Sequence, residues 1–359
     1  MSEKQIRVIV IDDSAYNRQT LGQMLEADPN IVVVARASDG EEGLKLVAEH
    51  RPDLITLDLE MPRMDGFTFL RILMSKMPTP VIVISSNSRK QAVFQALELG
   101  AVDFIAKPTR HISPELESIR TELVEKVLLF RHIRMLALQQ KATDRPIIKA
   151  PQPGDDKILP KSAPGDMRCI AMGASTGGPP ALQQLLSQFP TGTTAAILIA
   201  QHMPPKFTKA FAERLDRGSR ISVKEAEEGD LVLPGRALIT PGGKNMVLER
   251  RDQQRIVRLE DRQDDDRYVP SIDKMFVSAA EQFGPRLLAV VLTGMGMDGR
   301  AGVGRVRQRG GKVIAESKES AVIFGMPKEV IDAGLADWVL PLGRIFEPIE
   351  QFAFGKRTS

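Results

Sequence analysis

The chain has 359 residues, of which 42% are hydrophobic and 26% charged, with a formal net charge of +3. These values are typical of a globular protein of two domains, and so small a net charge does not by itself suggest a nucleic-acid binder. No apolar run approaches the ~18 residues of a membrane span, and the single cysteine, Cys169, suits a reducing compartment, so we expect a soluble, cytoplasmic protein without direct membrane insertion.

Short apolar runs alternate with amphipathic segments in the first part of the chain. The apolar runs predict strands over 6–11, 31–36, 53–59, 80–86 and 103–108. The segments between them predict helices over 14–25, 41–50, 66–76 and 89–100, and a fifth helix is expected to start at 113–114 and to continue towards 136. This alternation predicts a parallel sheet with helices on both faces, a flavodoxin-like (βα)5 domain over residues 1–130.

Polar side chains stand where these strands end. Asp12 and Asp13 follow the first strand, Asp58 ends the third, Ser85 closes the fourth and Lys107 the fifth. The carboxyl ends of parallel strands meet at one edge, where three carboxylates repel one another unless a cation is present. Oxygen ligands without His or Cys suit Mg²⁺. Any one of these aspartates is explained as well by an ordinary loop position, but the set predicts a magnesium site.

The stretches VIDDS, LDLEMPRMDG, VISS and GAVDFIAKP resemble the receiver domain of bacterial two-component response regulators over roughly residues 5–125. The resemblance implies that a phosphoryl group is transferred to Asp58, that Asp13 and Asp58 bind Mg²⁺ directly, and that Asp12 binds it through water. It assigns the phospho-acceptor Asp58, the metal ligands Asp12, Asp13, Asp58 and Glu60 (through its main-chain carbonyl), and the switch residues Ser85, Phe104 and Lys107.

The composition changes at about residue 143. Residues 143–166 are rich in proline and have no amphipathic period, so they cannot bury enough apolar surface to fold alone. We expect a linker over 131–166, helical and then proline-rich. From residue 167 a second αβ pattern predicts strands over 168–174, 195–201, 286–294 and 311–317. It indicates a doubly wound, mostly parallel α/β domain over 167–351, with a tail over 352–359.

Ser175 lies in the stretch GASTG, directly after the strand expected at 168–174. The stretch satisfies G-x-S-x-G, the pattern of a nucleophile on a sharp strand-to-helix turn. Backbone N–H groups at the start of the next helix would be placed to hold an oxyanion. A plain helix-capping serine followed by prolines explains the stretch equally well. A dinucleotide-binding loop and a P-loop lack their required residues here.

His202 and Asp298 follow two other expected strands. His202 ends the strand at 195–201, and the other three histidines of the chain fall in its first half, so His202 is the candidate base of the second domain. Asp298 lies in the glycine-dense loop after the strand at 286–294, where a turn or helix-cap role is the alternative. The three side chains are expected at one sheet edge, in a chain order that differs from that of α/β-hydrolases.

The stretches GASTGGPPAL, AQHMPPKFT, ITPGGKNM, VPSIDKMF, LTGMGMDGRAG and VIFGMPKEVIDAG resemble the catalytic domain of the chemotaxis protein-glutamate methylesterases. A receiver, a linker and this domain form that family's whole architecture. The resemblance implies a triad of Ser175, His202 and Asp298, with the backbone N–H groups of Thr176 and Met295 as oxyanion donors.

The function implied by the resemblance is phosphorylation-activated hydrolysis of glutamate γ-methyl esters on methyl-accepting chemoreceptors, and deamidation of receptor glutamines, in chemotaxis adaptation. The implied partners are the cytoplasmic helices of the receptors and a chemotaxis histidine kinase as phosphodonor. Mg²⁺ is expected at the receiver site, with no cofactor for the ester hydrolysis and no nucleic-acid partner.

Three alternatives stand beside this hypothesis. A homologous protein of the same kind could serve a chemosensory pathway unrelated to motility. A DNA-binding output is common in response regulators, but residues 167–351 show no compact helix-turn-helix pattern. A catalytically silent scaffold of the same fold would be excluded if a serine-directed acylating reagent trapped Ser175 and the reaction were lost in His202→Ala.

Overall fold

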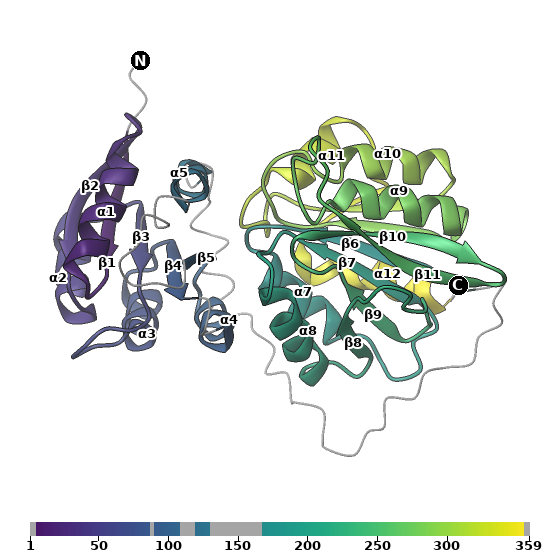
Figure 1. Ribbon diagram of the computed structural model, residues 1–359, viewed down its shortest axis with the longest axis horizontal. Coiled ribbons are helices and arrows are strands. Elements are labelled where there is room, and N and C mark those ends of the chain that lie inside the picture. The colour runs from purple at the N-terminus through teal and green to yellow at the C-terminus, as the bar shows by residue number, and fades with distance from the viewer. Residues whose placement is uncertain (1–4, 87–89, 108–118, 130–166, 355–359) are drawn as a thin grey trace. The chain divides into compact units, whose positions relative to one another are not determined.

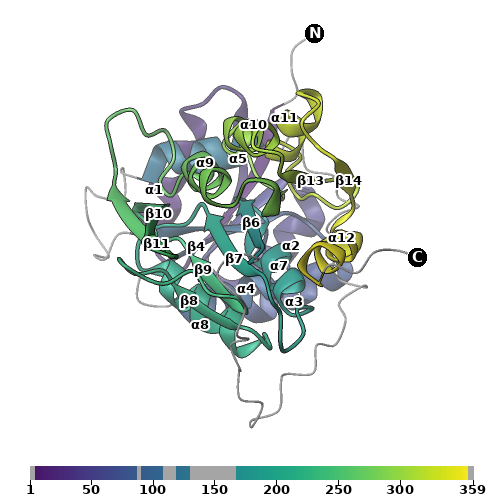
Figure 2. The same ribbon diagram turned by 90° about the vertical axis from the view of Figure 1, so that its right-hand side faces the viewer.

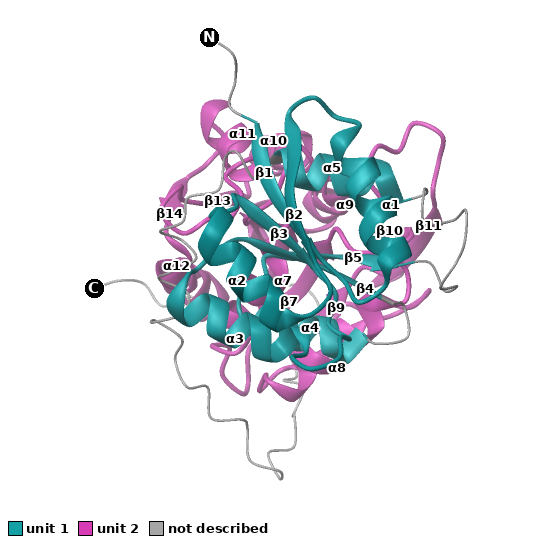
Figure 3. Cartoon of the chain, turned by 90° about the vertical axis from the view of Figure 1, so that its left-hand side faces the viewer, with its two compact units in different colours: residues 1–145 teal, residues 146–359 magenta. Residues whose placement is uncertain are grey.

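The computed structural model describes residues 5–86, 90–107, 119–129 and 167–354. The chain forms two compact units, Met1–Arg145 and Pro146–Ser359 (Figure 3). The linker expected over 131–166, and the helix start expected at 113–114, lie outside the described residues. Within the described residues, no helix is both long enough and apolar enough to cross a membrane.

The first unit is built on a five-stranded parallel sheet with the strand order β2-β1-β3-β4-β5. Helices α1 and α5 cover one face of the sheet, and α2, α3 and α4 cover the other (Figures 1 and 3). This arrangement confirms the predicted flavodoxin-like fold. The elements are β1 (Ile6–Ile11), α1 (Ala15–Glu26), β2 (Ile31–Ala37), α2 (Gly40–His50), β3 (Leu54–Leu57), α3 (Gly66–Lys76), β4 (Val81–Ser86), α4 (Lys90–Glu98), β5 (Asp103–Lys107) and α5 (Arg120–Leu129).

Side-chain caps determine where the first helices of this unit begin. Ser14 caps α1 immediately after Asp12 and Asp13, which therefore lie in the loop at the carboxyl edge of the sheet. Asp39 caps α2, and Asp65 caps α3 by accepting a hydrogen bond of 2.7 Å from a backbone N–H in the first turn. Such caps satisfy N–H groups that have no partner within the helix. The loop residues ahead of each helix are thereby held in place.

The second unit is built on a seven-stranded sheet with the order β14-β13-β12-β6-β7-β9-β8, in which every pairing is parallel. A separate antiparallel hairpin is formed by β10 and β11. The strands are β6 (Cys169–Ala174), β7 (Ala196–Gln201), β8 (Ser222–Glu225), β9 (Arg236–Ile239), β10 (Lys244–Arg251), β11 (Gln254–Asp261), β12 (Leu287–Val291), β13 (Lys312–Glu316) and β14 (Trp338–Leu340). The doubly wound, mostly parallel fold predicted for this domain is confirmed, and a seven-stranded sheet is not the compact helical domain of a DNA-binding output.

Helices cover both faces of this sheet. In Figures 1 and 2, α9, α10 and α11 lie on one face, and α7, α8 and α12 lie on the other. These helices are α7 (Gly178–Leu186), α8 (Phe207–Arg217), α9 (Ile272–Phe283), α10 (Arg300–Gln308), α11 (Met326–Asp332) and α12 (Leu342–Phe354), and a short 3-10 turn, η3 (Gly284–Arg286), follows α9. Every residue of the central strands β6, β7 and β12 is buried. Polar side chains just beyond these strands are therefore held on a rigid base.

The C-terminal helix departs from the predicted boundary. Helix α12 continues to Phe354, so the first three residues of the tail expected over 352–359 belong to this helix. The Thr194 hydroxyl donates a hydrogen bond of 3.0 Å to the Ala353 carbonyl, and Arg168 donates to the Phe352 carbonyl. These bonds tie the last turn to the start of β6 and to the loop before β7.

Candidate active site

Ser175, His202 and Asp298 lie at the carboxyl ends of three neighbouring strands. Ser175 follows β6, His202 follows β7, and Asp298 lies in the loop between β12 and α10, so the strand order β12-β6-β7 brings them together. The Ser175 N–H donates to the Thr293 carbonyl, and the His202 N–H donates to the Ala174 carbonyl, each at 3.0 Å. The sheet edge anticipated from the sequence is therefore where all three residues are found.

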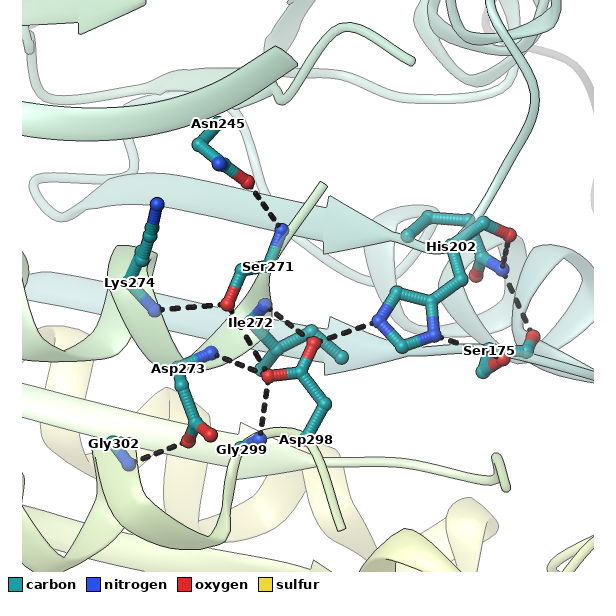
Figure 4. Close-up of polar contacts among 11 residues, drawn as sticks. Ser175, His202, Asn245, Ser271, Ile272, Asp273, Lys274, Asp298, Gly299 and Gly302 are labelled. Carbon is teal, nitrogen blue, oxygen red and sulfur yellow. Dashed lines mark hydrogen bonds and ion pairs between the residues drawn. The ribbon is translucent and has the colours of Figure 1, made fainter. Parts of the chain in front are cut away.

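The three side chains form one hydrogen-bonded chain (Figure 4). His202 Nδ1 lies 3.2 Å from Ser175 Oγ, and His202 Nε2 lies 2.8 Å from Asp298 Oδ2. A carboxylate can only accept, so the ring proton of the neutral imidazole is assigned to Nε2, and Nδ1 is left with its lone pair towards the serine hydroxyl. In this tautomer the imidazole can accept the Ser175 proton.

Asp298 is held by the N-terminus of α9. Its Oδ2 accepts from the Ile272 N–H at 2.8 Å, and its Oδ1 accepts from the Asp273 N–H at 2.9 Å and the Gly299 N–H at 3.1 Å (Figure 4). Burial disfavours the charged form, but the hydrogen bond to His202, the charge of His202 and the α9 N–H groups outweigh it and hold the pKa of Asp298 below its usual value. The alternative of a helix-capping aspartate is therefore partly right: Asp298 binds the start of α9 and the imidazole together.

The capping alternative for Ser175 is wrong. The N-cap of α7 is Gly177, whose φ of 78° lies in the left-handed region, and no side chain caps this helix. Prolines at the start of α7 leave fewer N–H groups that need a cap. The Ser175 hydroxyl contacts His202 instead. The glycine after Thr176 thus serves the sharp turn that the motif predicted.

The loop that contains Met295 passes directly over Ser175. A Cβ built on Gly294 would lie 2.7 Å from Ser175 Cβ, so only glycine permits this approach. The Thr293 hydroxyl donates to the Thr176 carbonyl at 2.9 Å, which ties the loop to the serine turn. The assignment of the Thr176 and Met295 N–H groups as oxyanion donors remains a prediction.

Several residues that hold this site were missed from the sequence. The Asn245 amide accepts a hydrogen bond of 2.8 Å from the N–H of Ser271, the N-cap of α9, and donates one of 2.8 Å to Asp266. On the other side of the site, the buried Glu316 carboxylate accepts from the Thr293 N–H at 2.8 Å. The serine after a proline in VPSID is a helix-start signal that could have been used. Nothing local to Asn245 or Glu316 indicates these long-range contacts.

Asp273 connects α9 to α10. Its Oδ1 accepts a hydrogen bond of 2.6 Å from the Gly302 N–H in the first turn of α10, whose own N-cap, Gly299, has no side chain to offer. Burial, together with the neighbouring charge of Asp298 and against the Gly302 bond, raises the pKa of Asp273 to about 6. Between about pH 4 and pH 6 the folded chain therefore binds a proton at Asp273 that the unfolded chain, with a carboxyl pKa near ~3.9, has lost.

We expect Asp273→Asn to stabilise the second unit at pH 7.5 and to change its stability little at pH 4.5. A raised carboxyl pKa makes the wild-type free energy of unfolding fall as the pH rises through this window, and asparagine removes that loss while its carbonyl still accepts from Gly302. The melting temperature difference should grow by roughly 2–4 °C between the two pH values. Fluorescence of Trp338, the single tryptophan of the chain, reports unfolding of this unit. A difference independent of pH would contradict the argument.

The acidic cluster of the first unit surrounds an ammonium group. Carboxylate oxygens of Asp12, Asp13 and Asp58 lie within 4.8 Å of one another. Lys107 Nζ lies 2.7 Å from Asp12 Oδ2 and 2.5 Å from Asp58 Oδ2. The Asn17 amide, which was missed from the sequence, donates to Asp12 Oδ1 at 3.1 Å. The set of three carboxylates is typical of a magnesium site, because a single ammonium leaves their charge incompletely balanced.

Burial, together with the charges of Asp12 and Asp13 and against that of Lys107, raises the pKa of Asp58 to about 6. Burial alone would lower the pKa of the Lys107 ammonium. The carboxylates of Asp12 and Asp58 outweigh this effect and raise that pKa above its usual value. The Glu60 N–H donates to Asp58 Oδ1 at 3.2 Å.

Ser85 and Phe104 are both buried, on β4 and β5, and Lys126 donates to the Phe104 carbonyl at 2.7 Å. The predicted receiver residues are thus found on the loops and strands of one sheet.

Comparison with known proteins agrees with this arrangement of two units. The family described as CheB methylesterase matches residues 170–349, and the family described as response regulator receiver domain matches residues 8–114. Protein-glutamate methylesterase/protein-glutamine glutaminase 3 of Geobacter sulfurreducens is 48% identical over 363 residues, which cover 97% of each chain. Protein-glutamate methylesterase/protein-glutamine glutaminase 1 of Myxococcus xanthus is also 48% identical and covers 99% of each chain.

A solved structure is similar to the second unit. The crystal structure of the Thermotoga maritima CheB methylesterase catalytic domain aligns with a TM-score of 0.50 and 42% sequence identity, over 51% of this chain and 97% of that chain. The two relatives thus match almost the whole chain, and the solved catalytic domain matches about half of it. The protein belongs to the CheB family of protein-glutamate methylesterases/protein-glutamine glutaminases, in which an N-terminal receiver domain precedes a C-terminal methylesterase domain.

Proposed function

We propose that this protein is a phosphorylation-regulated serine esterase that hydrolyses glutamate γ-methyl esters on the cytoplasmic helices of methyl-accepting chemoreceptors. The relatives named above are methylesterases and glutaminases by name. As a member of their family, this chain has the same two activities, which serve chemotaxis adaptation. The observation that carries the proposal is the continuous hydrogen-bonded chain from Ser175 Oγ through the His202 imidazole to the Asp298 carboxylate. We place the receiver at 1–130, the linker at 131–166 and the catalytic domain from 167 to the end of α12 at Phe354.

The first half of the reaction forms an acyl-enzyme. Ser175 Oγ attacks the ester carbonyl carbon while its proton passes to His202 Nδ1. The imidazole then carries a positive charge, and Asp298, held ionised by the start of α9, stabilises it through Nε2–H. The oxyanion is bound by the N–H groups of Thr176 and Met295, and each such donor typically contributes about 2.7–4 kcal/mol to transition-state stabilisation.

Collapse of the tetrahedral intermediate breaks the ester C–O bond, and His202 Nδ1–H gives its proton to the departing methanol. Water then attacks the acyl-enzyme by the same route, with Nδ1 as base, and releases the glutamate carboxyl and the free Ser175 hydroxyl. A glutamine side chain undergoes the same sequence with ammonia as the leaving group. One triad therefore accounts for both activities.

The receiver supplies the regulation. Asp58 is the phospho-acceptor for a chemotaxis histidine kinase, and Mg²⁺ would be held directly by Asp13, Asp58 and the Glu60 carbonyl, and by Asp12 through water. A bound Mg²⁺ would supply positive charge beside the transferring phosphoryl group. The Lys107 ammonium, already within hydrogen-bond distance of Asp58, pairs with the phosphoryl oxygens. Ser85 and Phe104 respond to the phosphorylated state, as the hydroxyl and aromatic positions of the switch.

We expect Asp58→Asn to abolish stimulation of the esterase by a small-molecule phosphodonor while basal activity remains. Asparagine has the shape of aspartate but no carboxylate to phosphorylate, so the receiver stays in its unmodified state. The assay is methanol release from methylated receptor membranes with Mg²⁺, with and without phosphodonor. Half-buried Asp28 lies outside the acidic cluster, and an asparagine there can still accept the hydrogen bond that Asp28 Oδ1 accepts from the Asn30 N–H, so Asp28→Asn provides the control. Stimulation of the Asp58→Asn protein to the wild-type level would refute the assignment of Asp58.

A further inference from the structure

An aromatic ring that belongs to no part of the triad lies against the imidazole. The rings of Tyr268 and His202 are stacked, with centroids 4.8 Å apart and planes inclined by 9°. Tyr268 precedes Ser271, the N-cap of α9, by three residues. The short segment 268–273 therefore contacts His202 through a ring face and Asp298 through the N–H groups of α9.

The other end of the phenol contacts the loop over Ser175. A Cβ built on Gly296 would overlap the Tyr268 hydroxyl oxygen, and Gly296 has a φ of +84°. Gly296 follows Met295, the expected oxyanion donor, and precedes Asp298 by two residues. Tyr268 thus contacts both the base and the loop that carries the carboxylate and the expected oxyanion donor.

The charges around the imidazole come from three segments. Asp298 lies on its Nε2 side, Asp273 lies behind Asp298 at the start of α9, and the exposed Arg267 has its guanidinium carbon 5.4 Å from the centroid of the Tyr268 ring. Ser175 contributes an uncharged hydroxyl at Nδ1. An aromatic face attracts a cation, so it favours the imidazolium over the neutral imidazole.

We propose that Tyr268 is a positioning residue of the esterase, which holds the His202 ring in its triad orientation and stabilises the imidazolium that forms when Ser175 attacks. The proposal rests on the proposed function. The face of the phenol ring stabilises the charge of the imidazolium, and the hydroxyl end contacts the loop at Gly296. Ring-face stabilisation should survive in Tyr268→Phe and be lost in Tyr268→Leu.

The full-length variants Tyr268→Phe and Tyr268→Leu test the proposal by methanol release over a range of pH. In Tyr268→Leu the rate on the pH-independent plateau should fall about two- to fivefold, because the imidazolium of the transition state is less stable. The acid limb of the kcat/KM profile should move to lower pH by about half a unit, because the uncharged imidazole persists to lower pH. Tyr268→Phe should keep the wild-type acid limb.

A second readout does not depend on the receptor substrate. A serine-directed acylating reagent modifies Ser175 at a rate set by His202, and its pH profile should show the same shift in Tyr268→Leu. Loss of rate without movement of the acid limb in either assay, or equal profiles for the Phe and Leu variants, would overturn the proposal. Wild-type labelling of Ser175 without methanol release would instead refute the proposed substrate, and the labelling profiles would still decide the role of Tyr268. Trp338 fluorescence shows whether each variant is folded.

Discussion

Replacement of Ser175 by alanine is expected to reduce kcat for methanol release by about 10⁴–10⁶-fold. The side chain supplies the protein atom that would bond to the substrate carbon, and alanine leaves His202 with no serine hydroxyl to deprotonate. Residual turnover would come from the oxyanion donors and substrate binding alone. Methanol release from methylated receptor membranes under single-turnover conditions measures a difference of this size between the rates of Ser175→Ala and wild type. The control is Ser187→Ala, which removes a hydroxyl that donates to the Gln184 carbonyl at the end of α7.

Loss of the base should cost almost as much as loss of the nucleophile, because the two act as one unit. We expect His202→Ala to lower kcat by a similar factor, and the double variant Ser175→Ala/His202→Ala to be little worse than either single one. Multiplication of the two factors in the double variant would show that the residues act independently. A Ser175→Ala protein within tenfold of wild type would exclude the triad altogether.

Much of the fold could be predicted because buried parallel strands are continuous apolar runs. The strands β1, β6, β7 and β12 have nearly every residue buried and were recognised for that reason. The two edge strands of the second sheet, β8 and β14, were missed because they lack this signal: β8, with the sequence SVKE, is four residues long, half charged and only partly buried. Hairpin β10–β11 was missed because its turn at Asp252, with a φ of 55°, contains no glycine to mark it.

The candidate site could be predicted as far as strand topology determines it. Ser175 and His202 each follow an apolar run directly, Asp298 lies in the loop after a third, and adjacent parallel strands bring such positions together without further information. The hydrogen bonds from the start of α9 to Asp298 could not be predicted, because they depend on how this helix packs against a loop 25 residues later in the chain. The orientation of the imidazole, with Nδ1 towards the serine, depends on the same packing.

The contacts of Asp298 with the start of α9 make Asp298→Asn the second variant with a large expected effect, since both carboxylate oxygens accept hydrogen bonds from backbone N–H groups. Oδ1 accepts from two backbone N–H groups, of Asp273 and Gly299, whereas Oδ2 accepts from one backbone N–H and from His202. An asparagine must place its NH₂ group on one of these two sides. The Oδ2 side has fewer fixed donors, because the imidazole can change tautomer and a backbone N–H cannot. The NH₂ group is therefore expected to face His202.

With an NH₂ donor opposite Nε2, the neutral imidazole carries its proton on Nδ1, where it can no longer accept the Ser175 proton. We expect kcat to fall on the order of 10⁴-fold at neutral pH, the size of effect known for a triad histidine in the wrong tautomer. Exposed Asp261, which pairs with Lys244 away from the triad, provides the control Asp261→Asn. Trp338 fluorescence separates misfolding from loss of chemistry, because an unpaired N–H of Ile272 alone costs about 1–3 kcal/mol of stability. Activity within tenfold of wild type in a folded Asp298→Asn protein would mean that the hydrogen bonds between α9 and Asp298 stabilise the fold and do not select the imidazole tautomer.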